Sequence, residues 1–334
     1  MTAPLLQTRG LSKQFKVGGS LARRTLHAVD DADLVINRKE IVALVGESGS
    51  GKSTIARLLA RVYRPTSGEI LYQGRSLATM RTRRQTMAYR SDVPMVFQDP
   101  FSSLNPAYRV SHGILRGLKL HRRELTRAQR LAEAERVVEA VGLTPAAQIL
   151  DRFPHELSGG QRQRIGFAQA LAYEPKLVIA DEPVSMLDVS IRLGLLNLMA
   201  KLRADSGVSF LYITHDIASA RYLADRLLVM YAGHIVESGP TETVLADPKH
   251  PYTQLLLSAV PDPRAPLAVG ADSDTGEPPR VIDPGPGCRF RWRCPLAIDT
   301  CANITPQPRL LAAEHVAACH VAESELPAPV AADN

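Results

Sequence analysis

The sequence has no run of about eighteen consecutive apolar residues, although 45% of its 334 residues are apolar. A helix that crosses a membrane needs such a run, so no membrane span is predicted. The amino terminus, Met1 to Leu6, also lacks the charged segment and following apolar stretch of a secretory signal. We therefore expect the protein to stay in the cytosol.

Cysteine is absent until the last fifth of the chain, which holds Cys288, Cys294, Cys301 and Cys319. Persistent disulfides are disfavoured in a reducing cytosol, whereas closely spaced thiols commonly hold a metal or a cluster. The intervals between these cysteines are longer than the tight spacing of zinc-ribbon ligands. A metal site of another kind and buried free thiols both fit the pattern.

Acidic residues are fewer than basic ones, with 34 Asp and Glu against 40 Lys and Arg. Basic residues gather at 81–84 and at 116–123. Such clusters can meet phosphates or lipid headgroups, but a net charge of only +6 is more typical of a solvated surface. The length exceeds what one compact domain usually needs, so we expect a core domain plus an extension.

The spacing of apolar residues predicts a first part made of short antiparallel strands and a later part in which strands and helices alternate. Short strands such as Gln14–Val17 and Leu34–Ile36 are predicted first, then a buried strand at Ile41–Val45. A helix over Lys52–Val62 and a strand over Glu69–Tyr72 follow. The later elements are expected to be a helix at about 160–172, a strand at 177–180, a helix at 190–204, a strand at 209–214 and a helix at 217–224. This alternation is typical of a parallel sheet with helices on both faces.

A helical pattern occupies about 105–142 and predicts a helical subdomain inserted into the α/β core. Its clearest helix is Thr126–Val141, which Gly142 ends. One apolar face is expected there, made of Leu131, Ala134, Val137, Val138 and Val141. Further on, Pro261–Gly287 is rich in Pro, Gly and Asp and predicts a linker or long loop.

A phosphate-binding loop follows the strand Ile41–Val45. It fits the pattern G-x-x-x-x-G-K followed by Ser or Thr, with residues Gly46, Glu47, Ser48, Gly49, Ser50, Gly51, Lys52 and Ser53. Glycines are needed because backbone N–H groups must turn inward onto phosphates. Lys52 adds positive charge, Ser53 a Mg²⁺ ligand, and Thr54 continues the helix whose N-terminus faces the phosphates. The motif predicts that the chain binds a nucleoside triphosphate.

Two adjacent carboxylates, Asp181 and Glu182, end the buried strand that begins at Leu177. The carboxyl end of a strand is where an α/β sheet presents ligands. Asp181 fits the carboxylate linked to Mg²⁺, and Glu182 fits the general base that polarises the attacking water.

The sequence Leu157-Ser158-Gly159-Gly160-Gln161 opens a helix, and Ser158 with Gln161 has the pattern of a capping box. These five residues resemble the signature of ATP-binding-cassette (ABC) ATPases, and they lie between the phosphate loop and the acidic pair. The resemblance implies that this helix start contacts the γ-phosphate of an ATP bound by a partner subunit. Each ATP would then be sandwiched in a head-to-tail dimer of cassettes.

Further residues match the ABC pattern one by one. The resemblance implies that Gln98 senses Mg²⁺ and water and that His215 contacts the γ-phosphate. Asp188 lies in a loop that would span the dimer interface, with Met186 where alanine is more usual. Phe15 lies where the family stacks adenine on an aromatic ring.

The whole chain, including His250–Thr253 and the approach to Cys288, resembles the ATPase subunits of dipeptide and oligopeptide ABC transporters. In some members this cysteine pattern is associated with an iron–sulfur (4Fe-4S) cluster, so the resemblance implies that all four cysteines are ligands. Arg289, Arg291 and Arg293 could then offset the negative charge of the cluster. Zinc and buried free thiols remain the alternatives.

The resemblance implies an α/β P-loop cassette with a mostly parallel core sheet, an N-terminal antiparallel β subdomain, an inserted helical subdomain at about 100–165 and a small C-terminal extension. The cassette would take residues 1–260, a linker 261–287, the cysteine extension 288–322 and a disordered tail 323–334.

ATP hydrolysis would power an importer of peptides or related solutes, oligosaccharides included. The implied partners are a second ABC ATPase subunit, two transmembrane permease subunits and, indirectly, an extracytoplasmic solute-binding protein. We expect no nucleic-acid partner. We expect the protein to be attached peripherally to the cytoplasmic face of the cell membrane.

A soluble ABC ATPase acting on nucleic acid or ribosomes is the main alternative. DNA-acting types usually carry a long coiled coil between the phosphate loop and the signature, and ribosome-acting types fuse two cassettes. Here Lys52 and Ser158 are separated only by a short helical subdomain, and one cassette is present. An exporter ATPase is less favoured, because exporters often fuse the cassette to membrane spans. A redox-sensing regulator has no support beyond the cysteines.

Overall fold

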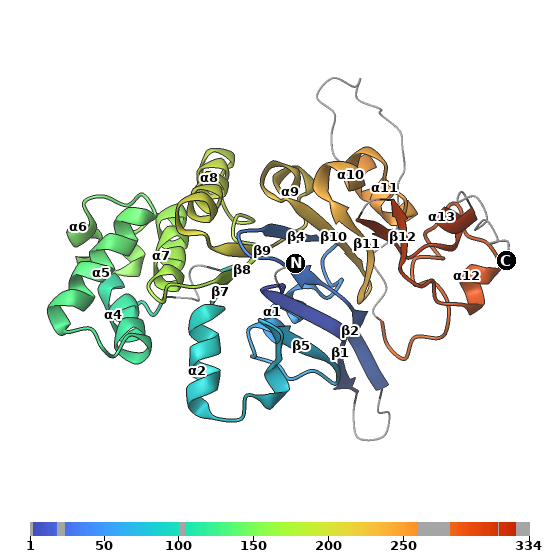
Figure 1. Cartoon of the computed structure of the whole chain (residues 1–334). Helices are drawn as coiled ribbons and strands as arrows, with labels where there is room; N and C mark the ends of the chain where they lie inside the picture. Colours follow the sequence, from blue (N-terminus) through green and yellow to red (C-terminus); the bar gives the residue numbers. More distant parts are fainter. Residues whose placement is uncertain (1–2, 19–23, 100–103, 260–280, 313, 325–334) are drawn as a thin grey trace.

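The computed structural model describes residues 3–18, 24–99, 104–259, 281–312 and 314–324. Two β-sheets and three groups of helices build the molecule (Figure 1). The predicted core of the linker, 261–280, and the predicted tail from 325 onward lie outside the described residues.

The larger sheet has eight strands in the order β12-β13-β11-β10-β4-β9-β8-β7. Five neighbours from β10 to β7 are parallel, and β11, β13 and β12 continue the sheet antiparallel. The strands are β4 (Ile41–Val45), β7 (Met95–Val96), β8 (Leu177–Asp181), β9 (Ser209–Thr214), β10 (Arg226–Tyr231), β11 (His234–Pro240), β12 (Arg309–Ala312) and β13 (His315–Ala317). Every residue of β4, β8 and β9 is buried, which explains their continuous apolar sequences.

Alternate residues of β4 enter two different hydrophobic cores. Ile41, Ala43 and Val45 face one core together with the helices on that side of the sheet. Val42 and Leu44 face the other core, which contains the helix α1 (Lys52–Leu59) and the smaller sheet. This two-sided burial follows from the two-residue period of a strand.

The smaller sheet is antiparallel, as predicted, and has the strand order β2-β1-β5-β6, with β3 pairing to β1. Its strands are β1 (Leu6–Val17), β2 (Arg24–Ala32), β3 (Val35–Ile36), β5 (Ser67–Tyr72) and β6 (Arg75–Ser76). β1 is three times as long as the predicted strand Gln14–Val17, because it pairs with β2 along one part and with β5 along another.

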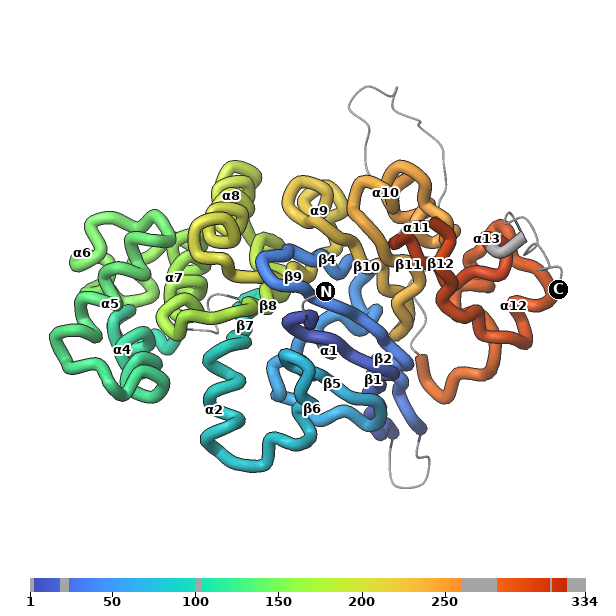
Figure 2. Tube along the Cα trace, in the orientation of Figure 1, coloured from blue at the N-terminus to red at the C-terminus, as the bar shows by residue number. Residues whose placement is uncertain are grey.

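The helical subdomain lies at one end of the molecule (green in Figure 2). It contains α4 (Val110–His121), α5 (Arg127–Ala140), α6 (Ala146–Asp151), the short 3-10 helix η2 (Pro154–Glu156) and α7 (Gly159–Leu171). Ala134, Val137 and Val138 of α5 are fully buried. Leu131, which was placed on the same apolar face, is 47% exposed and lines a groove together with residues of α4.

Other helices cover the core sheet or connect it. These are η1 (Leu77–Thr79), α2 (Arg83–Asp92), α8 (Val189–Ser206), α9 (Ile217–Leu223), α10 (Thr241–Ala246) and α11 (Pro251–Ser258). Figure 1 shows α8, α9 and α10 on one side of the core sheet, and α1 with the smaller sheet on the other.

The carboxyl-terminal extension lies at the end opposite the helical subdomain (red in Figure 2). Its elements are α12 (Thr300–Asn303), β12, β13 and α13 (His320–Ser324). β13 pairs with β11, so the extension continues the core sheet and is not a separate unit. Helix α13 includes the first two residues of the predicted tail.

Candidate functional site

The predicted phosphate-binding loop joins the carboxyl end of β4 to α1. Close packing explains two of its glycines, which have positive φ angles. A Cβ atom on Gly46 would lie 2.1 Å from the Met230 carbonyl oxygen, and one on Gly51 would lie 2.2 Å from the Ala28 carbonyl oxygen. The loop is therefore held between β10 and β2 in a form that only glycine permits at these two positions.

Lys52 is the first residue of α1, and its amino group turns back over the loop. Nζ donates to the carbonyl oxygens of Gly46 at 2.7 Å and Glu47 at 2.9 Å. Burial lowers the pKa of Lys52, whereas the nearby carboxylates of Glu182 and Asp181 oppose that change. The cation is thus fixed inside the curve of the loop, where the phosphates of a nucleotide would lie.

Ser53 and Asp181 come together from α1 and the end of β8. The Ser53 hydroxyl donates to Asp181 Oδ1 at 3.1 Å. Burial raises the pKa of Asp181, and the hydrogen bond from Ser53 acts in the opposite direction. A hydroxyl and a carboxylate are oxygen ligands of the kind that Mg²⁺ prefers, so the pair fits the predicted metal role.

Glu182 is the meeting point of the other predicted catalytic residues. Gln98 Nε2 donates to Glu182 Oε2 at 3.0 Å, and His215 Nδ1 lies 3.5 Å from the same oxygen. Glu182 has a φ angle of 46°, a left-handed conformation that is costly for a residue with a side chain. Its N–H donates to the Ile213 carbonyl, so neighbouring strand β9 holds the residue in place.

A cleft of about 1080 Å³ contains these groups. Its lining includes the phosphate loop, Gln98, Glu182 and His215, as well as Phe15 from β1. The Phe15 ring is half-buried and meets Tyr63 edge to face at 5.4 Å between ring centres. Phe15 and Lys52, predicted to contact the adenine and the phosphates, therefore line the same cleft.

The signature residues do not line this cleft. The Ser158 side chain accepts from the Gln161 N–H at 3.2 Å, and the Gln161 side chain accepts from the Ser158 N–H at 3.0 Å. This confirms the predicted capping box at the start of α7. Gly160 allows α7 to approach α8, because a Cβ there would lie 2.5 Å from Ile191. Met186 and Asp188, in the nearby predicted interface loop, are exposed.

Sequence reasoning missed the residues that hold Glu47. Its N–H donates to the Tyr252 hydroxyl at 2.9 Å, and its carboxylate accepts two hydrogen bonds from Arg293. Arg289 forms a similar ion pair with Asp30. The sequence had suggested that both arginines balance a cluster charge, but each guanidinium is paired with a carboxylate of the cassette. Only the fold brings together residues so far apart in sequence.

The four cysteines gather in the extension, and none is in a disulfide. Burial raises the pKa of Cys288 to about 11 and also raises that of Cys294. Within the part of the chain that the structure describes, no group of three or more His, Cys, Asp or Glu side chains is arranged to hold a metal ion. The described geometry therefore does not support a 4Fe-4S or zinc site.

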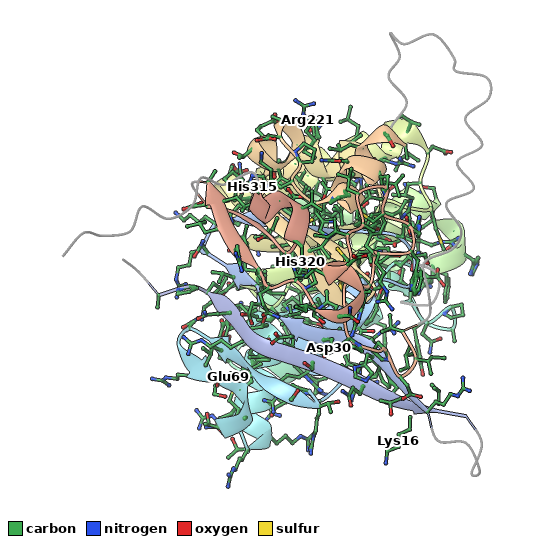
Figure 3. All side chains as sticks on the ribbon, turned by 90° about the vertical axis from the view of Figure 1, so that its right-hand side faces the viewer. Lys16, Asp30, Glu69, Arg221, His315 and His320 are labelled. Atoms are coloured by element: carbon green, nitrogen blue, oxygen red, sulfur yellow. The ribbon has the colours of Figure 1, made fainter. Side chains whose placement is uncertain are left out.

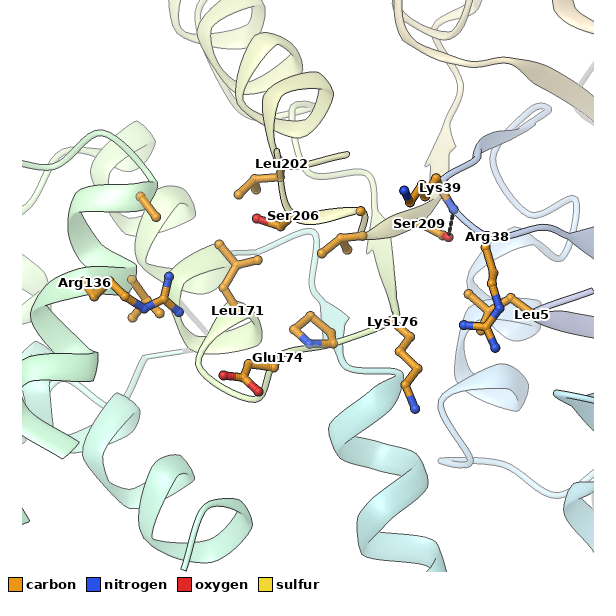
Figure 4. Close-up of a pocket in the computed structure, with 15 residues that line it drawn as sticks. Leu5, Arg38, Lys39, Arg136, Leu171, Glu174, Lys176, Leu202, Ser206 and Ser209 are labelled. Atoms are coloured by element: carbon orange, nitrogen blue, oxygen red, sulfur yellow. Dashed lines mark hydrogen bonds between the residues drawn. The ribbon is translucent and has the colours of Figure 1, made fainter. Parts of the chain in front are cut away.

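A second pocket, of about 520 Å³, lies at the amino ends of β4, β8 and β9 (Figure 4). Lys39, Lys176 and Ser209 line it, and the Lys39 N–H donates to the Ser209 hydroxyl at 2.8 Å. It contains none of the predicted site residues and lies at the end of the sheet opposite the phosphate loop. No helix among the described residues is long and apolar enough to span a bilayer.

A parallel sheet with a phosphate loop at its carboxyl end, and with Glu182, Gln98 and His215 beside that loop, defines a P-loop nucleotide-binding cassette. A family model described as ABC transporter matches residues 29–185, and one described as oligopeptide/dipeptide transporter, C-terminal region, matches residues 236–301.

Curated relatives match almost the whole chain. A putative peptide import ATP-binding protein of Brucella ovis is 42% identical over 316 residues, covering 95% of this chain and 97% of the relative. The putative oligopeptide transport ATP-binding protein YkfD of Bacillus subtilis is 41% identical over 320 residues, covering 95% of each chain. This chain therefore belongs to the ATPases of the ABC transporter family.

Solved structures agree with this assignment. A dimeric post-hydrolysis state of the cassette MJ0796, bound to ADP and Pi, is similar with a TM-score of 0.63 and 26% identity. The match covers 71% of this chain and 98% of that one. The cassette cbiO1 from Clostridium perfringens, part of the transporter complex cbiONQ, has the same score and identity. The predicted fold class is thereby confirmed.

Proposed function

We propose that this chain is the ATP-hydrolysing, energy-coupling subunit of an importer of peptides or related solutes. The observation that carries the enzymatic part is the convergence of Gln98 and His215 on the Glu182 carboxylate beside the phosphate loop. The relatives named for peptide import match the chain from the cassette through the extension, which supports the importer assignment. Nothing comparable favours an action on nucleic acid or ribosomes.

Each residue of the cleft has a distinct role in this proposal. Glu182 accepts a proton from the attacking water, and Gln98 and His215 orient that water and the γ-phosphate. Ser53, Asp181 and Gln98 hold Mg²⁺, which neutralises phosphate charge when bound. Lys52 and the loop amides bind the phosphates, and Phe15 stacks on the adenine.

The signature residues Ser158, Gly159, Gly160 and Gln161 act on the ATP of a second cassette. They lie outside their own cleft, at the start of α7, where Ser158 is exposed, and the N-terminus of a helix suits an anion. Asp188 lies beside them at the interface. The second cassette is a copy of this chain or a related subunit, and a dimeric similar structure supports this arrangement.

Two transmembrane permease subunits complete the machine in this proposal, with a solute-binding protein outside the membrane. This chain docks peripherally at the cytoplasmic face. Affinity purification from gently solubilised membranes, followed by mass spectrometry, tests this part. Recovery of multi-span permeases is expected, whereas recovery of ribosomal or DNA-bound proteins alone would contradict it.

Glu182→Gln tests the catalytic part. We expect ATP affinity to stay within about twofold, while turnover falls by about 10²–10³-fold, because an amide cannot accept the proton. Glu174→Gln, on the surface, is the matched control and should keep normal turnover. Normal hydrolysis by Glu182→Gln would remove Glu182 from the role of base.

Metal content of the extension is a separate question. The 4Fe-4S cluster stays a prediction, with zinc and free thiols as alternatives. Anaerobic purification followed by iron, sulfide and zinc analysis distinguishes the three. Broad visible absorption with iron and sulfide would support the cluster, and stoichiometric zinc without iron would exclude it.

A further inference from the structure

The phosphate-binding loop is held by a residue 246 positions further along the chain. Arg293 Nη1 and Nη2 donate to the two carboxylate oxygens of Glu47 at 2.8 and 2.9 Å. The side chains are only 11% and 24% exposed, so water weakens the pair less than it would on an open surface. A bidentate pair of this kind fixes direction as well as distance. Glu47 is thereby held in one orientation.

Tyr252 holds the backbone of the same residue. Its hydroxyl accepts the Glu47 N–H at 2.9 Å, and its side chain is fully buried at the amino end of α11. The ring packs against Tyr231 and Phe290, with ring centres 4.5 and 5.5 Å away. Both the amide and the carboxylate of Glu47 are therefore bound by residues from beyond the nucleotide cleft.

A second arginine in the same turn supports the loop from another side. Arg289 pairs with Asp30 of β2 and donates to the Ala232 carbonyl oxygen. The next residue, Gly233, donates its N–H to the Ser50 carbonyl at 2.8 Å. Figure 3 shows Asp30 on its strand below the extension, which faces the viewer. The turn thus contacts the loop directly through Glu47 and indirectly through Ser50.

The turn that carries both arginines is itself firmly held. Within it, the Arg291 N–H donates to the Cys288 carbonyl and the Arg293 N–H to the Phe290 carbonyl. The Cys288 N–H donates to the Cys301 carbonyl of α12. Phe290 is 1% exposed between Tyr231 and Tyr252. These contacts therefore hold the backbone from which the Arg293 side chain extends.

Charge makes this contact relevant to nucleotide binding. Glu47 lies between Gly46 and Ser48, within the loop that is proposed to bind the phosphates of the nucleotide. An unpaired carboxylate there would repel the nucleotide, and partial burial would strengthen the repulsion. Arg293 cancels that charge and fixes the loop at once.

We propose that Arg293 is a positioning residue of the ATP site, so that the C-terminal extension sets nucleotide affinity through Glu47. The proposal rests on the proposed ATPase function and goes beyond it, because it assigns a part in ATP binding to the extension. Arg293 itself does not line the nucleotide cleft. It acts on affinity and leaves the chemical step, which depends on Glu182, largely unchanged.

The test compares variants of the full chain by the dissociation constant of ATP and by KM and kcat for hydrolysis. Arg293→Ala should raise the dissociation constant and KM by about tenfold, with kcat changed by less than about threefold. Arg293→Lys keeps the positive charge but cannot form the bidentate pair, so its affinity for ATP should lie between those of the wild type and Arg293→Ala. Arg291→Ala is the matched control and should stay within about twofold of the wild type, because the Arg291 guanidinium contacts the Pro286 and Cys288 carbonyls and the Trp292 ring but no residue of the phosphate loop.

The double variant Arg293→Ala with Glu47→Gln gives the decisive readout. Because the repelling carboxylate is gone, it should bind ATP more tightly than Arg293→Ala alone. A merely structural role for Arg293 would predict that the double variant is no better, and that result would overturn the proposal, as would equal effects of Arg293→Ala and Arg291→Ala. Thermal unfolding of each variant confirms that it is folded. Failure of the wild type to bind ATP would instead overturn the proposed function itself.

Discussion

Two short segments, one at the start of α7 and one in the C-terminal extension, differ in where their polar groups find partners. The turn 288–294 directs Arg289 and Arg293 into ion pairs with carboxylates of the same chain. The signature segment 157–161 makes its described polar side-chain contacts only within its own capping box and leaves Ser158 exposed. The first segment completes its interactions within one chain, whereas the second presents a helix N-terminus outward. We infer that the turn acts on its own nucleotide and that the signature acts on that of a partner.

Removing the aromatic anchor of the turn should have the largest effect on stability. Phe290→Ala empties a fully buried position between Tyr231 and Tyr252, so the free energy of unfolding should fall by about 3–5 kcal/mol. Trp292→Ala is the matched control, because that side chain, two residues away, is 80% exposed. Denaturant unfolding measures both. Equal losses would show that the turn is not anchored through Phe290.

The next largest effect on the free energy of unfolding should come from low pH, through His250, which lies beside the same aromatic cluster. Burial lowers the pKa of His250 to about 3, and the ring caps α11 by accepting the Tyr252 N–H. The unfolded chain, with a histidine pKa of about 6.5, therefore binds more protons between about pH 3 and 6.5. The contribution of this group is complete above pH 6.5 and is lost as the pH falls below it, by about 2 kcal/mol at pH 5.

His250→Asn keeps a capping acceptor and removes the titrating group. Its free energy of unfolding should fall less steeply between pH 7 and 5 than that of the wild type, as followed by urea unfolding at each pH. His155→Asn, at an exposed position, serves as the control and should keep the wild-type slope. Parallel curves for wild type and His250→Asn would remove His250 from this role.

The smallest effect on stability should come from a substitution in the signature segment. Here the decisive comparison between variants is their ATP turnover. Ser158→Ala and Thr126→Ala each remove the N-cap of a capping box, of α7 and α5 respectively, so each should lose about 1 kcal/mol of stability. Only Ser158→Ala should also lower ATP turnover, because only this cap belongs to the signature. Calorimetry and a phosphate-release assay measure the two quantities. Similar turnover in the two variants would argue against a role for Ser158 at a partner's ATP.

Local sequence patterns predicted several elements of the α/β part but missed others, among them β10 and β11. The strand Ser209–Thr214 has the predicted bounds, and the buried strand Ile41–Val45 is β4. These strands are buried on both faces, so they appear in the sequence as short continuous apolar runs. Helical spacing predicted the apolar face of α5 but not that Leu131, at its amino-terminal end, is 47% exposed, because spacing does not show how far the neighbouring elements cover a face.

The sequence by itself determined the chemistry of the cleft. A phosphate-binding loop is formed by consecutive residues. A catalytic carboxylate lies directly after a strand. A capping box joins two residues three positions apart, here Ser158 and Gln161. All of these are short-range requirements, so they leave motifs. Tertiary structure alone decided which distant groups hold the loop. Arg293, Tyr252 and Glu47 meet because β13 pairs with β11 and because Tyr252 and Phe290 belong to the same hydrophobic core. An ion pair between remote residues leaves no spacing to recognise.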